Sequence, residues 1–314
     1  MKKKILPAVC LLTATLLRSS VLFSDPTGAA FLKIPAGARA SAMGSAFTAV
    51  SDDASAIYWN PSGTADLKRR EVFLMHSQWI SNMNYELASV VQPFGTGAVG
   101  IGVAYLAQGV YEGRDEERKR TQDFTASDLA ASFSFSRKFG VSNYGVNLKL
   151  IHQNIDTESA LGFALDAGAK FQKAGSPLSL GLALQNIGPQ MKFVEQGYDL
   201  PLTLSAGAAY RIWAPLSFAL DLRQRIYTGN TSVSAGMEYW AFNTLAIRTG
   251  YISNPGTLAY GGSTSKQDSE LKVEKFTGLG FGIGLKIFGH QIDYALVPYG
   301  ELGIAHQISM LAHF

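Results

Sequence analysis

The chain has 314 residues, of which 27 are Lys or Arg and 24 are Asp or Glu, so its formal net charge is only +3. Four of these basic residues lie within the first 24 positions, and the rest of the chain carries about one net negative charge. This balance excludes a basic surface for nucleic acid as a partner. The single cysteine, Cys10, excludes a disulfide framework.

The first 24 residues are typical of an export signal. Three lysines at positions 2–4 precede an apolar stretch over residues 5–17, which is too short to cross a bilayer. We therefore expect a secretory signal peptide over residues 1–24, cut near Ser24. Beyond it, the sequence has no run of roughly 18 apolar residues, so a helical membrane protein is excluded.

Most of the remaining sequence alternates with a period of two. In the clearest case, over residues 277–287, an apolar row alternates with a row of Gly and Lys. The apolar row is Leu279, Phe281, Ile283, Leu285 and Ile287, and the other row is Gly278, Gly280, Gly282, Gly284 and Lys286. Similar rows occur over residues 98–105, 161–171 and 216–223. An apolar face turned to lipid, opposite a polar or bare inner face, indicates a closed transmembrane sheet. A face without side chains also indicates that something else approaches it closely.

We predict about fourteen strands from this pattern. They begin near residues 71, 84, 97, 124, 141, 160, 177, 201, 215, 230, 243, 275, 290 and 303. Three long connections, at residues 108–123, 188–200 and 255–272, are all odd-numbered in this count, and the even connections are short turns. Long outer loops and short periplasmic turns are typical of outer-membrane barrels. The sequence therefore predicts an all-β, antiparallel transmembrane barrel over residues 71–314.

The end of the sequence carries a further address signal. Ile308, Met310, Ala312 and Phe314 share one face of the last predicted strand. A terminal aromatic residue after alternating apolar residues looks like the signal that outer-membrane assembly machinery reads. We therefore expect Phe314 to be an assembly signal, and we expect a bacterial outer-membrane location with membrane lipids and the barrel-assembly machinery as partners.

Residues 25–70 do not alternate, and we predict that they form a hatch, or plug, inside the barrel. A short helix of small residues is expected over residues 41–50, because small residues permit close approach to the bare inner face. Asp52 or Asp53 is expected to cap a second helical turn, which Asn60 and Pro61 end.

Three motifs of this segment resemble the amino-terminal hatch of the FadL-type outer-membrane transporters, most closely their PorV/PorQ-like branch. They are Ala36–Arg39 with Met43 and Gly44, then residues 52–56, then residues 59–63. The resemblance implies a fourteen-stranded barrel that the hatch occludes. The hatch residues that it marks are Gly37, Arg39, Gly44, Asp52, Asp53, Ser55, Asn60, Pro61 and Gly63.

The resemblance implies one of two functions. The wider family passes hydrophobic molecules such as long-chain fatty acids without a chemical energy source, which implies passive uptake of a hydrophobic small molecule or lipid. PorV-like members serve type IX secretion instead. The alternative is therefore an interaction protein in protein secretion, with secretion-system proteins as partners.

The inward rows of the predicted strands mix acids and bases. They include Asp128, Lys149, Asp166, Lys170, Asp221, Arg223, Arg225, Lys286 and Asp293. Two adjacent carboxylates inside a barrel need counter-charges, so we expect Arg223 and Arg225 to pair with Asp52 and Asp53 and hold the hatch shut. In the alternative, the aspartates only cap a hatch helix.

The sequence predicts no enzyme, no catalytic residue, no metal site and no cofactor. Residues 95–100 match the dinucleotide-binding fingerprint, but they open a strand and lack the helix terminus that holds a pyrophosphate. The five histidines are scattered singly without metal-ligand spacing. His152 and Asp156 are the nearest acid and base pair, and no third catalytic partner accompanies them.

Overall fold

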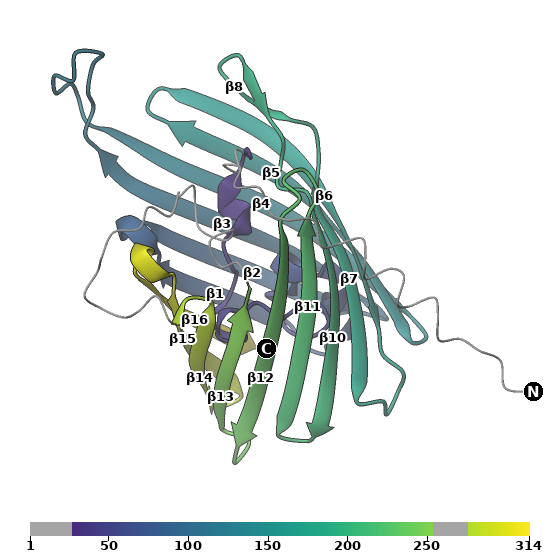
Figure 1. Ribbon diagram of the computed structural model, residues 1–314. Coiled ribbons are helices and arrows are strands. Elements are labelled where there is room, and N and C mark those ends of the chain that lie inside the picture. The colour runs from purple at the N-terminus through teal and green to yellow at the C-terminus, as the bar shows by residue number, and fades with distance from the viewer. Residues whose placement is uncertain (1–26, 254–275) are drawn as a thin grey trace, which may run out of the picture.

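The structure is a computed structural model, and it describes residues 27–253 and 276–314. Fourteen strands form one closed antiparallel barrel, in which the first strand pairs with the last (Figure 1). The predicted fold class and strand number are confirmed. The predicted signal peptide over residues 1–24 and the connection at 255–272 lie outside the described residues.

The predicted strand positions are accurate to within four residues, and the largest difference is at Leu279, where the twelfth barrel strand begins. The barrel strands are β1 (Glu71–Gln78), β2 (Asn84–Phe94), β3 (Gly97–Tyr111), β4 (Phe124–Phe139), β5 (Ser142–Ile155), β6 (Glu158–Phe171), β7 (Leu178–Ile187), β10 (Thr203–Trp213), β11 (Leu216–Arg225), β12 (Thr231–Ala241), β13 (Leu245–Ile252), β14 (Leu279–Ile287), β15 (His290–Pro298) and β16 (Ile304–His313).

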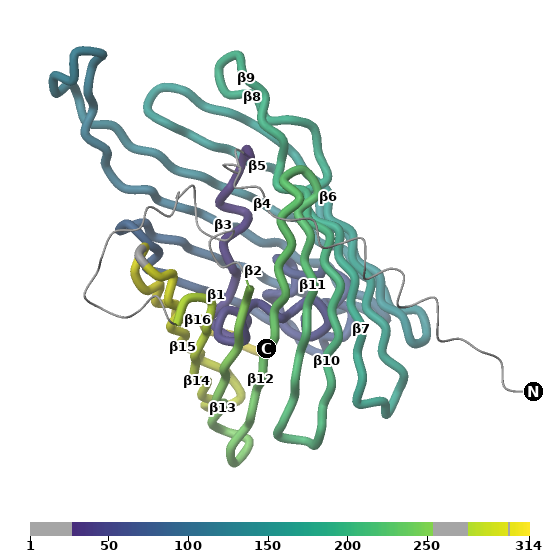
Figure 2. Tube along the Cα trace, in the orientation of Figure 1, coloured from purple at the N-terminus to yellow at the C-terminus, as the bar shows by residue number. Residues whose placement is uncertain are grey.

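The two ends of the barrel differ in their connections. One end, here called the short-turn end, carries turns such as residues 95–96 and 214–215. The opposite long-loop end carries the connection from β3 to β4 and the connection from β7 to β10. The second of these holds a small hairpin of β8 (Met191–Phe193) and β9 (Gln196–Tyr198). Figure 2 shows these long connections at the top and the short turns at the bottom. The predicted segregation of loop lengths therefore holds for the described connections.

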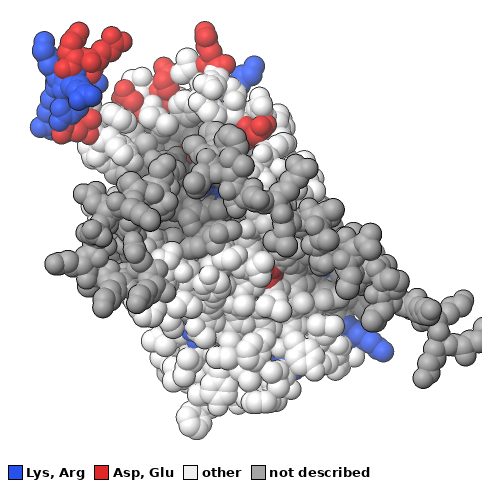
Figure 3. Space-filling model, in the orientation of Figure 1, with Lys and Arg blue, Asp and Glu red and all other residues white. Residues whose placement is uncertain are grey.

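The outer surface of the barrel is apolar along its strands. Ile101, Leu148 and Leu161 point outward and are 60%, 60% and 66% exposed. Figure 3 shows charged side chains gathered at the long-loop end, above a wall that is almost free of them. This is the surface that a membrane-spanning barrel presents to lipid. None of the helices within the described ranges is long and apolar enough to cross a membrane.

Residues 27–70, here called the inner segment, run through the inside of the barrel (Figure 2). The segment contains η1 (Ala30–Lys33), α2 (Ala38–Ala42), α3 (Ala56–Trp59) and η2 (Pro61–Asp66). The helix predicted over 41–50 is wrong in extent, because Gly44 and Ser45 have left-handed φ angles of 62° and 66° that end α2. The predicted break at Asn60 is confirmed, since α3 ends at Trp59 and the Asn60 side chain caps η2.

Backbone of the inner segment lies directly against glycines of the barrel wall. An ideal Cβ at Gly280 is 2.5 Å from the Ser41 carbonyl oxygen, and one at Gly250 is 2.3 Å from the Gly44 nitrogen. Similar approaches occur at Gly145, Gly168, Gly181, Gly236 and Gly282. Any side chain at these positions would push the inner segment away. The bare inner face predicted from the sequence is therefore the contact surface for residues 41–62.

We predict that Gly250→Val displaces the adjoining part of the inner segment, because the added carbons overlap Met43 and Gly44. Hydrogen exchange at residues 38–50 of the folded barrel would become faster. Thr249→Val is the matched control, since Thr249 is the neighbouring residue on β13 and points outward. Equal exchange in the two variants would contradict the packing argument.

Candidate functional site

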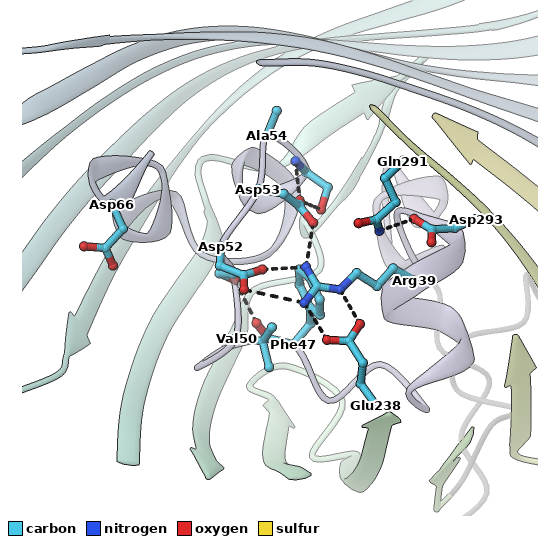
Figure 4. Close-up of polar contacts among 12 residues, drawn as sticks. Arg39, Phe47, Val50, Asp52, Asp53, Ala54, Asp66, Glu238, Gln291 and Asp293 are labelled. Carbon is cyan, nitrogen blue, oxygen red and sulfur yellow. Dashed lines mark hydrogen bonds and ion pairs between the residues drawn. The ribbon is translucent and has the colours of Figure 1, made fainter. Parts of the chain in front are cut away.

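Arg39 binds three carboxylates at the short-turn end of the lumen (Figure 4). Its Nη1 lies 2.5 Å from Oδ1 of Asp52 and 3.1 Å from Oδ2 of Asp53, both in the inner segment. Its Nε donates to Oε2 of Glu238 at 2.8 Å. Glu238 belongs to β12, so Arg39 joins two parts of the inner segment to the barrel wall.

The same ion-pair network continues along the wall. Glu238 also accepts a hydrogen bond from Nε of Arg248 at 2.7 Å, and Nη1 of Arg248 lies 2.7 Å from Oδ1 of Asp293. A Cβ at Gly284 would lie 2.5 Å from Nη1 of Arg248, so this glycine makes room for the guanidinium group. We call Arg39, Asp52, Asp53, Glu238, Arg248 and Asp293 the Arg39 cluster.

The predicted pairing of the two aspartates with Arg223 and Arg225 is wrong. The guanidinium of Arg223 lies 5.0 Å from the Trp59 ring centre. It donates hydrogen bonds of 3.4 Å to the Ser205 hydroxyl and to the Ser45 carbonyl. β11 runs from the short-turn end to the long-loop end, and Arg223 and Arg225 are among its last residues. They therefore lie toward the long-loop end, whereas Asp52 and Asp53 lie toward the short-turn end. Arg39 supplies the counter-charge instead.

Asp53 has a second role that agrees with the capping alternative. Its Oδ1 accepts hydrogen bonds from the nitrogen and the hydroxyl of Ser55, at 2.9 and 2.5 Å, and so caps the turn that leads into α3. Burial raises the pKa of Asp53, and the charge of Arg39 opposes this rise. For Arg39, burial would lower the pKa, but the carboxylates of Asp52 and Glu238 outweigh it and raise the pKa. Arg39 therefore stays charged inside the barrel.

Other residues of the predicted hatch motifs hold the inner segment in shape. Nδ2 of Asn60 donates to the carbonyls of Thr48 and Ala169 at 2.9 and 3.2 Å. Pro61 packs on Gly145 and Gly168, Gly44 packs on Tyr251, and Gly63 packs on Ser51. Gly37 precedes α2 with a left-handed φ of 94°. Phe314 follows β16, and its backbone nitrogen donates to the carbonyl of Arg70 at 2.9 Å.

Sequence reasoning gave no role to Asp221, which anchors the inner segment. Its Oδ2 accepts hydrogen bonds from the backbone nitrogens of Phe47 and Thr48 at 2.9 and 2.8 Å. The sequence did contain a signal for this role, because Asp221 is an acidic residue on an inward row, between the outward Leu220 and Leu222. A buried carboxylate in such a row needs donors, and here backbone N–H groups supply them.

A second feature lies on the long-loop side of the inner segment. A cavity of about 60 Å³ is enclosed between η1, α3 and the wall, and we call it the lumen chamber. Its apolar side is formed by Ile34, Tyr58, Trp59, Tyr85, Ala104 and Ala130, and its polar side includes Lys149, Gln185, Asn186, Arg223 and Arg225. Lys149 is paired with Asp166 at 2.7 Å.

The apolar side of the chamber continues along the wall of β2, β3 and β5. Leu87, Leu106 and Ile151 point inward from these strands and are 3%, 0% and 0% exposed. They pack in one cluster with Phe31 of η1. Among the described residues, no group of three or more His, Cys, Asp or Glu side chains is placed to hold a metal ion. The arrangement therefore offers apolar contact and hydrogen bonding to a ligand.

Comparisons of the sequence lead to an uncharacterised family. The profile of the uncharacterised protein family UPF0164 matches residues 27–162. A UPF0164 protein of Treponema pallidum (strain Nichols) is 26% identical in an alignment 266 residues long, which covers 77% of this chain and 61% of that protein. A second match in that organism is 25% identical over 171 residues, 50% of this chain and 53% of the other. The chain thus spans less than two thirds of the length of these relatives.

Comparisons of the structure lead to outer-membrane channels. The toluene transporter TodX of Pseudomonas putida superposes with a TM-score of 0.62 at 12% identity, over 88% of this chain and 97% of that chain. The CymD monoaromatic hydrocarbon channel gives a TM-score of 0.63 at 13% identity, over 89% and 97%. A FadL homologue of Pseudomonas aeruginosa gives 0.57 at 11% identity, over 90% and 99%. At these identities the likeness shows a FadL-like barrel fold.

We predict that Arg39→Met loosens the inner segment, because it leaves buried carboxylates without their counter-charge. The expected loss of stability is about 3 kcal/mol, with faster hydrogen exchange over residues 38–55. Lys138→Met is the matched control. It breaks the ion pair with Asp66, but Lys138 is 39% exposed, so the expected loss is under about 1 kcal/mol. Equal losses in both variants would refute a special role for Arg39.

We also predict that low pH destabilises the carboxyl-terminal end of the inner segment, at Asp66. Burial would raise the pKa of Asp66, but hydrogen bonds from Lys138 and Asn143 and the charge of Lys170 outweigh it and lower the pKa. A lowered folded pKa gives stability that is present at neutral pH and lost as the pH falls below about 4. The protection factors of amides 61–67, which are corrected for the intrinsic pH dependence of exchange, should therefore fall from pH 5 to pH 3, and Asp66→Asn should remove this fall.

Proposed function

We propose that this chain is a channel of the bacterial outer membrane that passes hydrophobic molecules passively, as FadL-type transporters do. The apolar outer wall and the segregation of long and short connections support a barrel set in that membrane. In this orientation the long-loop end faces outward and the short-turn end faces the periplasm. The predicted signal peptide over residues 1–24 agrees with export.

The observation that carries the proposal is the apolar inner wall beside the lumen chamber. The inward positions of a water-filled porin are polar. Here Tyr85, Leu87, Leu106 and Ile151 point inward and are at most 3% exposed. Large apolar side chains with a few polar groups nearby are typical of sites for hydrophobic ligands.

The solved structures with the same barrel fold agree with this class of solute. TodX is described as a toluene transporter and CymD as a monoaromatic hydrocarbon channel. We extend to this chain only the class, a hydrophobic small molecule or lipid.

In the proposed route, the segment predicted as the hatch, residues 25–70, blocks the lumen. The solute enters at the long-loop end past η1, binds in the lumen chamber, and then passes the hatch to leave laterally or into the periplasm. Its concentration gradient drives the net movement, and burial of apolar surface favours each binding step. The Trp59 ring and the inward Leu and Ile side chains supply that surface.

A disulfide across the proposed entrance tests the route. An ideal Cβ at Gly28 lies 3.5 Å from Cβ of Met191 on the β8 and β9 hairpin, which is within the range for a disulfide. We predict that Gly28→Cys with Met191→Cys, when oxidised, abolishes uptake of radiolabelled long-chain fatty acid or toluene into proteoliposomes. Reduction should restore uptake, and each single variant should transport normally. Equal uptake in the oxidised and reduced double variant would reject this entrance.

An alternative role in protein secretion has one structural feature in its favour. The tip of the connection from β3 to β4, residues 112–123, carries many charged side chains and projects from the long-loop end (Figures 1 and 3). Its ion pairs join Arg114 to Glu112 and Arg120 to Asp123, so it is shaped to meet water or another protein. Absence of uptake together with recovery of exported proteins in pull-downs, lost on deletion of this tip, would favour the alternative.

A further inference from the structure

The inner segment is attached unevenly to the barrel wall. Its later part, residues 45–66, makes many direct hydrogen bonds to side chains of the wall. Asn147 donates to the carbonyl of Ile57 at 2.6 Å, and Ser179 donates to the carbonyl of Ala49 at 3.0 Å. Asp221, Ser89, Lys170 and Gln185 add further bonds to this part. These strands, from β2 to β11, hold it from several sides.

α2 and the residues beside it are attached differently. Within the described part of the chain, their side-chain hydrogen bonds to the wall are those from Arg39 to Glu238, together with a contact of the Gly37 nitrogen with Sδ of Met75 at 3.0 Å. Otherwise Ala38 and Ala42 pack on Ala295 of β15. The Arg39 cluster is therefore the main polar attachment of α2.

α2 and the wall beside it carry buried polar groups that lack partners among the described residues. They are the hydroxyl of Ser41 on α2 and, on the wall, the hydroxyls of Ser77 and Ser309 and both amide atoms of Gln307. Ser77 of β1 stands opposite Gln307 of β16, and Gln307 stands opposite Ala295, on which α2 packs. Ser77 and Gln307 are 0% exposed. Buried polar groups of this kind bind water, because leaving them without partners costs free energy.

These groups form a polar seam between the two ends of the barrel. Along β16, the inward residues run from Gln307 to Ser309, which stands opposite Asp293 of the Arg39 cluster, and then to the apolar Leu311. The buried apolar Met75 and Phe73 of β1 border this row. Leu311 lines a cavity of about 360 Å³ at the short-turn end, together with Arg39, Glu71, Glu238 and His313. Toward the long-loop end, Trp79 and Tyr299 cover the seam, with ring centres 4.8 Å apart and edge to face.

We propose that the seam between α2 and strands β1, β15 and β16 is a hydrophilic passage for water and small hydrophilic solutes, closed by the Arg39 cluster at one end and by Trp79 with Tyr299 at the other. Displacement of α2 opens it, because the Arg39 cluster is the main polar attachment of α2 to the wall. The uncharged Ser and Gln side chains replace part of a solute's hydration as it passes.

This passage is separate from the proposed hydrophobic route. The lumen chamber lies against β2 to β5, β7, β10 and β11, whereas the seam lies against β1, β15 and β16. The residues from 45 to 66 stand between them and are fixed to the wall. The inference therefore goes beyond the proposed function and does not depend on it.

Ion conductance of the full barrel in planar bilayers tests the proposal. In KCl, the wild-type barrel should conduct weakly, and Arg39→Met combined with Trp79→Ala, which removes both closures, should raise the conductance by about tenfold or more. Glu238→Gln and Trp79→Ala open the two closures separately, so each should give a smaller rise, and they serve if Arg39→Met folds poorly. Lys138→Met removes an ion pair of the inner segment away from α2 and should leave the conductance at the wild-type level.

Thiol labelling locates the conducting path. In the barrel with both Arg39→Met and Trp79→Ala, a cationic methanethiosulfonate reagent should block the current when Gln307→Cys or Ser309→Cys is present. Ser134→Cys is the matched control, because Ser134 is 1% exposed on the inner face of β4 and its hydroxyl is also unpaired within the described ranges. The sole native cysteine, Cys10, lies in the predicted signal peptide.

The outcomes separate the two proposals. Wild-type conductance in variants whose folded state is confirmed by heat-modifiable migration would overturn the hydrophilic passage, and so would an equal block through Ser134→Cys. Neither result bears on uptake of hydrophobic solute, which the disulfide across Gly28 and Met191 tests. Likewise, a failure to detect uptake of hydrophobic solute would not change the interpretation of the conductance measurements.

Discussion

Backbone contact between the inner segment and a wall without side chains is the constraint on which the rest of the structure depends. At Gly168, Gly250 and Gly280 a single Cβ would overlap atoms of the inner segment. Glycine destabilises a strand, so these positions cost stability in the sheet. The close approach offsets this cost, because it lets carbonyl and N–H groups of the segment reach Asn147, Ser179 and Asp221 on the wall. An apolar barrel thus holds a polar backbone inside without leaving it unsatisfied.

The same contact divides the lumen into two sides with different chemistry. On the side of β2 to β5, large apolar residues such as Leu106 and Ile151 fill the space and leave a small chamber beside Trp59. On the side of β1, β15 and β16, Ser77, Gln307 and Ser309 lie among buried apolar side chains such as Phe73 and Met75, and the Arg39 cluster carries the charge. The inner segment is therefore held by many hydrogen bonds to its backbone on the first side and mainly by ion pairs on the second. This asymmetry is a property of the contacts and does not require a particular solute.

Most of the fold could be predicted from the sequence, because a period of two survives in every long strand and the side chain alone decides which face it joins. The site could not be predicted as fully. Arg223 was on the correct face, but its height along the barrel axis depends on strand tilt and stagger, which alternation does not encode. Arg39 lay in the recognised motif, and only the turn at Gly44 and Ser45 shows that it folds back toward Asp52. Asp221 was found on the inward row, while its backbone donors come from residues far away in sequence.

The two sides of the lumen nevertheless meet through a short series of ring and guanidinium contacts. Arg39 lies 5.3 Å from the ring centre of Phe47, and the Phe47 ring lies 6.0 Å from that of Trp59. The other neighbour of Trp59 is the Arg223 guanidinium at 5.0 Å, on the polar side of the lumen chamber. Close-packed side chains move together when one of them is displaced. A ligand that displaced Trp59 in the chamber would therefore press on Phe47, the residue against which the Arg39 guanidinium rests.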